Sequence, residues 1–477
     1  MKASAVKALA TRAHLLLSLA LFGCATFHPM PLTAAAVTKK LEIPDAREIR
    51  IQARSIKHPI LRPVLFDDRD GLSPDEAGIL AVILNPRLRA ARDQKGIAKA
   101  QLLQAGILPN PQLSYSFKSP VGGDKNGAAN GQGLGLNWAI HSLLARGARL
   151  DSARAHETSV ELEVAWKEWE VAEAARLHFY RLVIVRKRFA IAERLLGVRE
   201  QALEILKRGL SLGLKTTLDL SAGENAAQDA QAVLIRASSA REVERLALNH
   251  VLGFPGSKRM KLQKDVHINL PEKLPSVQTL EKGLDERRID LLALRLGYQS
   301  QEASVRAAIR SQFPKISIGF GVARDNDGLD TLNAGISIGI PIFDRNQGRI
   351  AEARATRKQL FDEYVARIFD ARAQIARLLE HLRAVKKRRE SLRASIQSLK
   401  KMTEHYRIAV AKGLGNILDS LTLMARLHER QLQFLALEEQ LANLAIALEI
   451  ASGRYLFTSG TTPPETDAPT QKRETSK

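Results

Sequence analysis

Cysteine is almost absent from this chain of 477 residues, because Cys24 is the only one. A single thiol excludes an intramolecular disulfide and a thiolate metal cluster. The sequence also lacks Ser-His-Asp and HExxH spacing, and no phosphate-binding glycine loop follows an expected strand. The 11 histidines are scattered, and we interpret His267 and His405 as surface residues. We therefore predict no enzymatic activity, no catalytic residue, no bound metal and no cofactor.

Aromatic residues are also scarce, at 5% of the chain, whereas 45% of the residues are hydrophobic and the formal net charge is +21. A basic charge of this size often indicates a nucleic-acid partner. However, no helix-turn-helix, zinc finger or aromatic-basic platform accompanies it, and Lys and Arg are spread along helical stretches beside Glu. We interpret the charge as solvated helix faces and predict no nucleic-acid partner.

Beyond the N-terminus, no apolar run reaches the ~18 residues that a membrane-spanning helix needs, so any membrane crossing is expected to use strands. The first residues combine basic side chains with the apolar run LLLSLALFG, which is typical of an export signal. Residues 21–24 (LFGC) resemble a bacterial lipobox, in which the cysteine becomes the lipidated first residue. We predict a signal peptide over 1–23, lipidation of Cys24 and a lipidated segment over 24–70. An incidental cysteine within the signal is the alternative.

Three blocks of the chain recur at a spacing of 200 residues. RGARLDSARA (146–155) matches the end of PIFDRNQGRIAEARA, SLGLKTTLDL (211–220) matches AKGLGNILDS, and LALNHVLG (246–253) matches the end of LAIALEIASG. Three blocks in one register predict an internal β-β-α-α duplication. The expected boundaries are a first repeat over 71–256, a linker over 257–278, a second repeat over 279–457 and a disordered tail over 458–477.

Each expected repeat carries two segments in which large apolar residues alternate with small or polar ones. These segments are 113–117, 134–140, 316–322 and 336–342. The alternation predicts a sheet with one apolar face, and the opposite Gly- and Ser-rich face suits a narrow wet lumen better than a soluble core. Because the edges of an open sheet leave backbone groups unpaired in lipid, we expect copies of the chain to close a barrel.

Long helices are expected after each pair of strands. No proline occurs from Gly147 to Gly209, and apolar residues recur there every three or four positions, as they do again over 368–402. About 60 helical residues at ~1.5 Å each make a rod of ~90 Å. Turns at 209–216 and 412–416 send a second helix back, and short helices are expected near 74–105 and 279–312. At the polar turn 344–348, Gly348 is expected to permit the change of direction.

The motifs LPNPQLS (108–114) and PIFDRNQGRIAEA (341–353), together with the expected architecture over roughly 70–457, resemble the TolC-like outer membrane efflux protein family. Within it they are most similar to the subgroup that serves heavy-metal cation exporters. The resemblance implies an α+β membrane protein in which four β-strands per chain contribute to a trimeric 12-stranded outer-membrane β-barrel, continued by a long α-helical barrel into the periplasm. It also implies a homotrimer, a periplasmic adaptor, an inner-membrane RND-type pump and contact with outer membrane lipid.

The same resemblance implies functional residues at the two helix-helix turns. Asp419 matches an acidic residue of the periplasmic gate. The residues that match adaptor-contacting tips are Gly213, Leu214, Thr217, Asp219, Gly413 and Leu414. Thr422 stands where some relatives carry a second carboxylate, and Gly415 stands where some carry a basic residue. Capping of the following helix is the alternative role for both aspartates.

Three functions are consistent with these expectations. The first is a passive exit duct for metal ions or small toxic molecules. The second is the outer membrane duct of a type I protein secretion system. The third is a structural lipoprotein whose helices bridge periplasmic layers, although such a protein does not need strands with one apolar face.

Overall fold

A computed structural model describes residues 25–66, 70–123, 127, 129–264 and 266–461. The chain divides into two compact units, Met1–Pro44 and Asp45–Lys477. In the first unit, α2 (Ala34–Leu41) begins where the Thr33 hydroxyl accepts a hydrogen bond from the Ala36 amide, and none of its residues is buried. Cys24 lies outside the described residues, so its lipidation stays a prediction.

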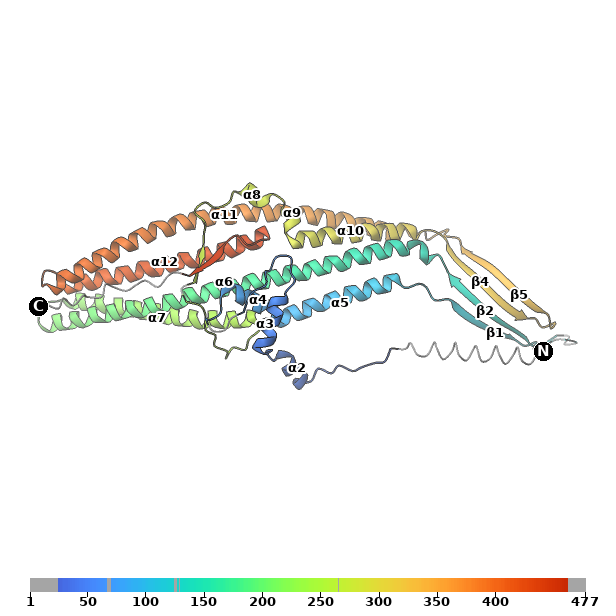
Figure 1. Ribbon diagram of the computed structural model, residues 1–477, viewed down its shortest axis with the longest axis horizontal. Helices are drawn as coiled ribbons and strands as arrows, with labels where there is room; N and C mark the ends of the chain where they lie inside the picture. Colours follow the sequence, from blue (N-terminus) through green and yellow to red (C-terminus); the bar gives the residue numbers. More distant parts are fainter. Residues whose placement is uncertain (1–24, 67–69, 124–126, 128, 265, 462–477) are drawn as a thin grey trace, which may run out of the picture. The chain divides into compact units, whose positions relative to one another are not determined.

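Four long helices dominate the second unit (Figure 1). They are α6 (Ser142–Ser211), α7 (Thr217–Leu252), α11 (Gln347–Ala411) and α12 (Ile417–Ser452). The 70 residues of α6 correspond to ~105 Å at ~1.5 Å per residue. In each half the chain turns back on itself, so that α7 packs on α6 and α12 packs on α11, while α12 also packs on α6. The predicted long helices and both predicted turns are confirmed.

Shorter helices precede each pair of strands. In the first half these are α3 (Ala46–Ser55), α4 (Pro74–Leu84) and α5 (Pro86–Gly106); in the second they are α8 (Val277–Glu281), α9 (Leu284–Arg287) and α10 (Ile289–Arg310). The expected helix near 74–105 is divided at Asn85, because Pro86 favours an extended residue before it and then starts α5. The side chains of α5 and α10 both pack against α6.

A four-stranded antiparallel sheet lies at one end of the long helices (Figure 1). Its strands are β1 (Gln112–Lys118), β2 (Gly131–Ala139), β4 (Lys315–Arg324) and β5 (Asp330–Gly339), in the order β1-β2-β4-β5. The register aligns Leu113 with Leu136, Leu136 with Phe320, and Phe320 with Ala334, so the apolar positions share one face as predicted. β5 ends earlier than expected, at Gly339, and Pro341 follows without an amide hydrogen for a ladder.

The polar turn between β5 and α11 is built on Asn346 and not on Gly348. Asn346 has φ 61°, in the left-handed region that asparagine tolerates better than most residues, whereas Gly348 already belongs to the first turn of α11. Asn346 is the N-cap residue of α11, although its side chain makes no capping hydrogen bond. Its side-chain nitrogen donates to the Ala308 carbonyl at 2.7 Å, and its backbone N–H donates to Asp344 at 2.8 Å. These bonds fix the sharp change of direction, which corrects the role predicted for Gly348.

A second, two-stranded sheet pairs β3 (Val266–Asn269) with β6 (Thr458–Thr461). The disordered tail was expected to begin at 458, and this expectation is wrong for residues 458–461, since they form a strand with backbone bonds to β3. The Asn269 side chain lies over Gly460, so a Cβ at this position would displace the end of that side chain. Residues 462–477 lie outside the described part of the chain.

Candidate functional site

The first helix-helix turn joins α6 to α7 and contains two of the predicted tip residues. Gly213 adopts φ 72° and its N–H donates to the Leu210 carbonyl, while the Leu214 N–H donates to the Gly209 carbonyl at 2.8 Å. This pair of bonds is the Schellman arrangement, which satisfies the last carbonyls of a helix and favours glycine at the left-handed position. Leu214 is left 75% exposed at the tip.

The second turn, between α11 and α12, repeats this geometry 200 positions later. Gly413 adopts φ 74° and donates to the Val410 carbonyl at 3.0 Å, and the Leu414 N–H donates to the Ala409 carbonyl at 2.9 Å. Leu414 is 79% exposed. Each tip therefore presents a rigid backbone turn and a leucine that no other part of the described chain covers.

The aspartate of the first tip is part of a capping box. The Asp219 carboxylate accepts hydrogen bonds from the Thr216 N–H at 2.9 Å and the Thr216 hydroxyl at 2.8 Å, and the Asp219 N–H donates back to that hydroxyl at 3.1 Å. The backbone and hydroxyl bonds from Thr216 lower the pKa of Asp219. Thr217, predicted as a tip residue, is the first residue of α7. Thr216 thus caps α7, and Asp219 completes the capping box.

The aspartate of the second tip makes a different contact. Here Asn416 is the cap, and its side-chain oxygen accepts from the Leu418 N–H at 2.9 Å. The Asp419 carboxylate accepts instead from the Tyr406 hydroxyl on α11, at 3.2 Å. The Asn416 N–H lies 3.4 Å from the same hydroxyl and donates to it. Position 422 holds a threonine and not a second acidic residue, and the Thr422 hydroxyl donates to the Leu418 carbonyl of its own helix.

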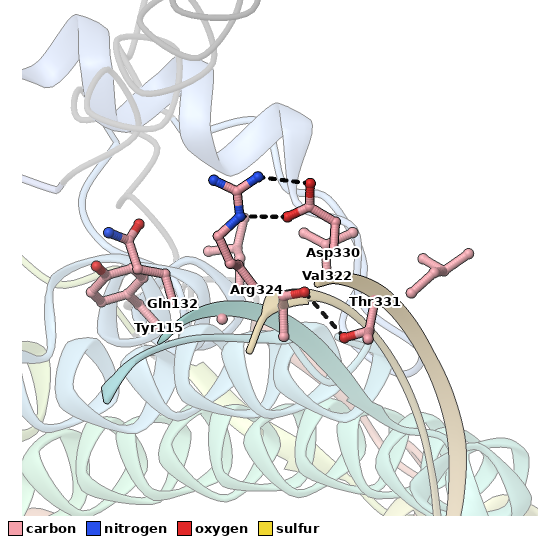
Figure 2. A pocket seen from close by; sticks show the side chains of 10 residues that line it. Tyr115, Gln132, Val322, Arg324, Asp330 and Thr331 are labelled. Atoms are coloured by element: carbon pink, nitrogen blue, oxygen red, sulfur yellow. Dashed lines mark hydrogen bonds and ion pairs between the residues drawn. The ribbon is translucent and has the colours of Figure 1, made fainter. Parts of the chain in front are cut away.

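The sheet presents an apolar face that the described residues leave open. Large side chains on it include Leu332 and Ile336, which are 81% and 71% exposed. Toward the β4–β5 loop, this face holds a groove of about 520 Å³ whose lining includes Tyr115, Gln132 and Val322. Figure 2 shows Arg324 and Asp330 joined there by two bonds, both of 2.9 Å. An open apolar surface of this kind indicates contact with lipid or with another protein.

Where the two halves meet, α6 and α12 share a buried cluster of charged side chains. Arg176 donates through one nitrogen to Glu173 at 2.8 Å and to Glu449 at 2.7 Å, and its Nε lies 3.2 Å from Asp75 on α4. Burial raises the pKa of Glu173 to about 8, with Arg176 opposing the shift and Glu449 adding to it. Glu449 also accepts from two backbone N–H groups just before β6. The cluster ties both halves to the C-terminal segment.

Among the described residues, no helix combines the length and the apolar character of a membrane-spanning helix. The same part of the chain holds no group of three or more His, Cys, Asp or Glu side chains placed to bind a metal ion.

Comparison with known families identifies the second half of the chain. Residues 282–454 match the family model described as "Outer membrane efflux protein". This region is an outer membrane efflux protein domain. It contains α10, β4, β5, α11 and α12, and with them the second tip, so the resemblance predicted from the sequence is confirmed.

Individual relatives extend the similarity beyond the efflux protein domain. The cobalt-zinc-cadmium resistance protein CzcC of Cupriavidus metallidurans is 22% identical over 392 residues, which cover 80% of this chain and 90% of CzcC. Among solved structures, CusC has a TM-score of 0.66 at 19% identity, covering 90% of this chain and 99% of CusC. VceC from Vibrio cholerae has a TM-score of 0.65 at 19% identity, covering 80% and 96%. The chain therefore shares the fold of CusC and VceC.

Sequence reasoning missed two features of this site. Tyr406 was overlooked, although it departs from the 200-residue repeat because Leu206 occupies the equivalent position. The buried cluster was also overlooked, although Glu173 and Arg176 stand one helical turn apart within a run of apolar and small residues. Their partner Glu449 is far away in the sequence, so the pairing itself had no local signal.

Proposed function

We propose that the chain is the outer membrane channel subunit of a tripartite efflux system and acts as a passive exit duct. The observation that carries the proposal is the open apolar face of the β1-β2-β4-β5 sheet, next to helices far longer than a globular core needs. An apolar face of four strands suits lipid, and a Gly- and Ser-rich opposite face suits a water-filled lumen. No catalytic chemistry is part of this role.

We further infer a homotrimer that closes a 12-stranded barrel, since three copies of four strands give 3 × 4 = 12. The support is that β1 and β5 are the outer strands of the sheet, each paired on one side among the described residues. Along the helices, α5 packs on α6, and α11 packs on α10, α12 and the short α8. A head-to-tail contact between such edges closes a ring when repeated by rotation. Lipid requires that closure, because open sheet edges leave backbone groups unpaired.

The equal construction of the two halves supports an internal duplication. α7 and α12 each contain 36 residues, and each ends at a left-handed glycine, Gly253 or Gly453. Together with the Schellman turns at both tips, this equivalence follows the 200-residue spacing of the sequence. We infer that one strand-strand-helix-helix unit gave rise to both halves.

The proposed substrates are heavy-metal cations or small toxic compounds, on the basis of the resistance function in the name of CzcC. We infer that an inner-membrane RND-type pump and a periplasmic adaptor deliver them, and that the adaptor contacts the exposed leucines of both tips. Lipidation of Cys24 would add an anchor in the outer membrane, with the helices extending into the periplasm. The alternative function, a structural lipoprotein that bridges periplasmic layers, does not account for the open apolar face of the sheet.

Conductance measurements test the proposed channel directly. Purified protein should form trimers by light scattering and give cation-preferring conductance in planar bilayers, because three Asp419 carboxylates at the periplasmic mouth attract cations. Asp419→Asn should reduce the cation preference and the block by multivalent cations, with the trimer retained, whereas Asp219→Asn should leave ion preference unchanged. Absence of conductance from a folded trimer would contradict the duct. Equal ion preference of wild type and Asp419→Asn would contradict only the gate.

Loss of the gene product provides the cellular test. A strain without this protein should tolerate less cobalt, zinc or cadmium, and the wild-type chain should restore tolerance. Unchanged tolerance to these cations, together with lost tolerance to organic toxic compounds, would shift the substrate class while leaving the duct in place. Retained tolerance to both classes would contradict an efflux role.

A further inference from the structure

Tyr406 links the two helices of the second tip through a single hydroxyl group. This oxygen accepts from the Asn416 N–H at 3.4 Å and donates to the Asp419 carboxylate at 3.2 Å. Tyr406 belongs to the last two turns of α11, whereas Asp419 lies in the first turn of α12. At the first tip, the Thr216 N–H donates directly to Asp219. At the second tip, the Tyr406 hydroxyl lies between the corresponding groups, the Asn416 N–H and the Asp419 carboxylate.

The two tips show how this difference arises from few residues. At the first tip, Leu206 replaces the tyrosine and packs beside Gly223, and Asp219 bonds to Thr216 without an intermediate group. At the second tip, Gly415 lies beside both Val410 and the Tyr406 ring. A Cβ at this position would lie 3.1 Å from the Val410 side chain and 3.5 Å from the Tyr406 ring. A side chain at 415 would therefore crowd Val410 first and would meet the Tyr406 ring at ordinary van der Waals distance.

Asp419 can change partner without loss of the helix cap. The side chain of Asn416 already caps α12 by accepting from the Leu418 N–H at 2.9 Å. Asp419 itself is exposed, and within the described part of the chain its carboxylate is bonded to Tyr406. Breaking that bond therefore frees the carboxylate while the turn and the start of α12 remain in place.

We infer that Tyr406 is a positioning residue that holds the Asp419 carboxylate against its own hairpin and so limits how far this charge reaches into the periplasmic mouth. The inference rests on the proposed channel function, because it assigns Tyr406 to the control of the same gate. The hydroxyl restrains the charge without removing it, since a hydrogen bond to a carboxylate orients the group and leaves it ionised. Loss of the hydroxyl and loss of the carboxylate should consequently act in opposite directions.

Ion selectivity in planar bilayers tests the restraint. Tyr406→Phe should raise the cation preference and strengthen block by multivalent cations, whereas Asp419→Asn lowers both. In the Asp419→Asn background, Tyr406→Phe should have no further effect on either property. Tyr298→Phe is the matched control, because the Tyr298 hydroxyl also donates to a carboxylate, that of Glu302 at 2.9 Å on α10, far from the tip in the chain. Wild-type selectivity in Tyr406→Phe, or an equal change in the Asp419→Asn background, would overturn the inference.

Hydrogen exchange separates this inference from the channel function on which it rests. In the purified protein, Tyr406→Phe should speed exchange of the Asn416 amide by roughly fivefold, the factor that one ordinary net hydrogen bond contributes. The Leu418 amide should stay protected, because Asn416 still caps it. Both measurements hold whether or not the protein conducts. Unchanged exchange at Asn416 would overturn the Tyr406 contact, whereas faster exchange in a non-conducting trimer would overturn the channel alone.

Discussion

The two helical hairpins have the same turn geometry, but their charged side chains make different contacts. The α6–α7 hairpin caps α7 with Thr216 and the bonded Asp219, and it buries Glu173 and Arg176 in the middle of α6, against Glu449 of α12. The α11–α12 hairpin instead turns Asp419 toward Tyr406, and α11 packs through an apolar row that includes Ile375. A duplicated plan therefore fixes turns and lengths, while substitutions at single positions give equivalent carboxylates different roles.

The largest difference between the hairpins is expected at Arg176. Arg176→Met removes the cation that bonds to the buried Glu173 and Glu449, which should lower the free energy of unfolding by about 3–5 kcal/mol. Denaturant unfolding of the solubilised protein measures this loss. Arg377→Met is the matched change on α11, where the arginine is exposed, and should stay within ~0.5 kcal/mol of wild type. Similar losses in both variants would remove the contrast between a charged and an apolar core.

The sheet is where the two halves are expected to behave alike. Leu136→Arg and Ile336→Arg change equivalent positions on the apolar face, and each should cost about 2–4 kcal/mol near mid-membrane. Asn137→Arg and Ser337→Arg, one residue along each strand, place the charge on the opposite face and should be tolerated better. Folding into lipid vesicles under denaturant compares the four variants. Equal tolerance of neighbouring positions would mean that this sheet is not a membrane wall.

The buried cluster should also make the contact between α6 and α12 depend on pH. Burial raises the pKa of Glu173 to about 8, so the folded state binds this proton more tightly than the unfolded state does. The resulting stability is complete below the ordinary glutamate range and is lost as the pH rises toward about 8. Glu173→Gln should flatten the slope of unfolding free energy between pH 5 and 8 by less than ~1.4 kcal/mol per pH unit. Glu193→Gln, an exposed change on the same helix, should keep the wild-type slope.

Patterns within one segment were predictable from the sequence, and partners across segments were not. The alternation of Leu134 with Gly135 and the glycines at 213 and 413 are local signals, since they reflect a pleated strand and a left-handed turn. The contact of Arg176 with Glu449 joins residues 273 positions apart. β6 was missed for a similar reason, because its pairing with β3 connects the linker to the chain end. Asn346 was missed because glycine is the commoner choice at a sharp turn.

The smallest effects are expected at the two helix caps. Thr216→Ala and Asn416→Ala each remove a side-chain acceptor from the start of a helix, which should cost about 1 kcal/mol of local stability. Hydrogen exchange at residues 216–220 and 416–420 reports each tip separately. Each variant should affect its own tip alone, because the tips belong to different hairpins.

The last prediction compares how far the protection of each tip from hydrogen exchange depends on its aspartate. Asp219 accepts two bonds from Thr216, and these bonds lower its pKa, so protection of the first tip should decline as the pH falls through the titration of Asp219. The second tip is capped by the neutral Asn416 side chain, and its protection at Leu418 should persist in acid. Likewise, Asp219→Asn should speed exchange at Thr216, whereas Asp419→Asn should leave Leu418 protected. If low pH and the two aspartate substitutions reduced protection equally at both tips, Asp419 would belong to a helix cap as Asp219 does. Such a result would contradict the role proposed for the Asp419 carboxylate at the periplasmic mouth.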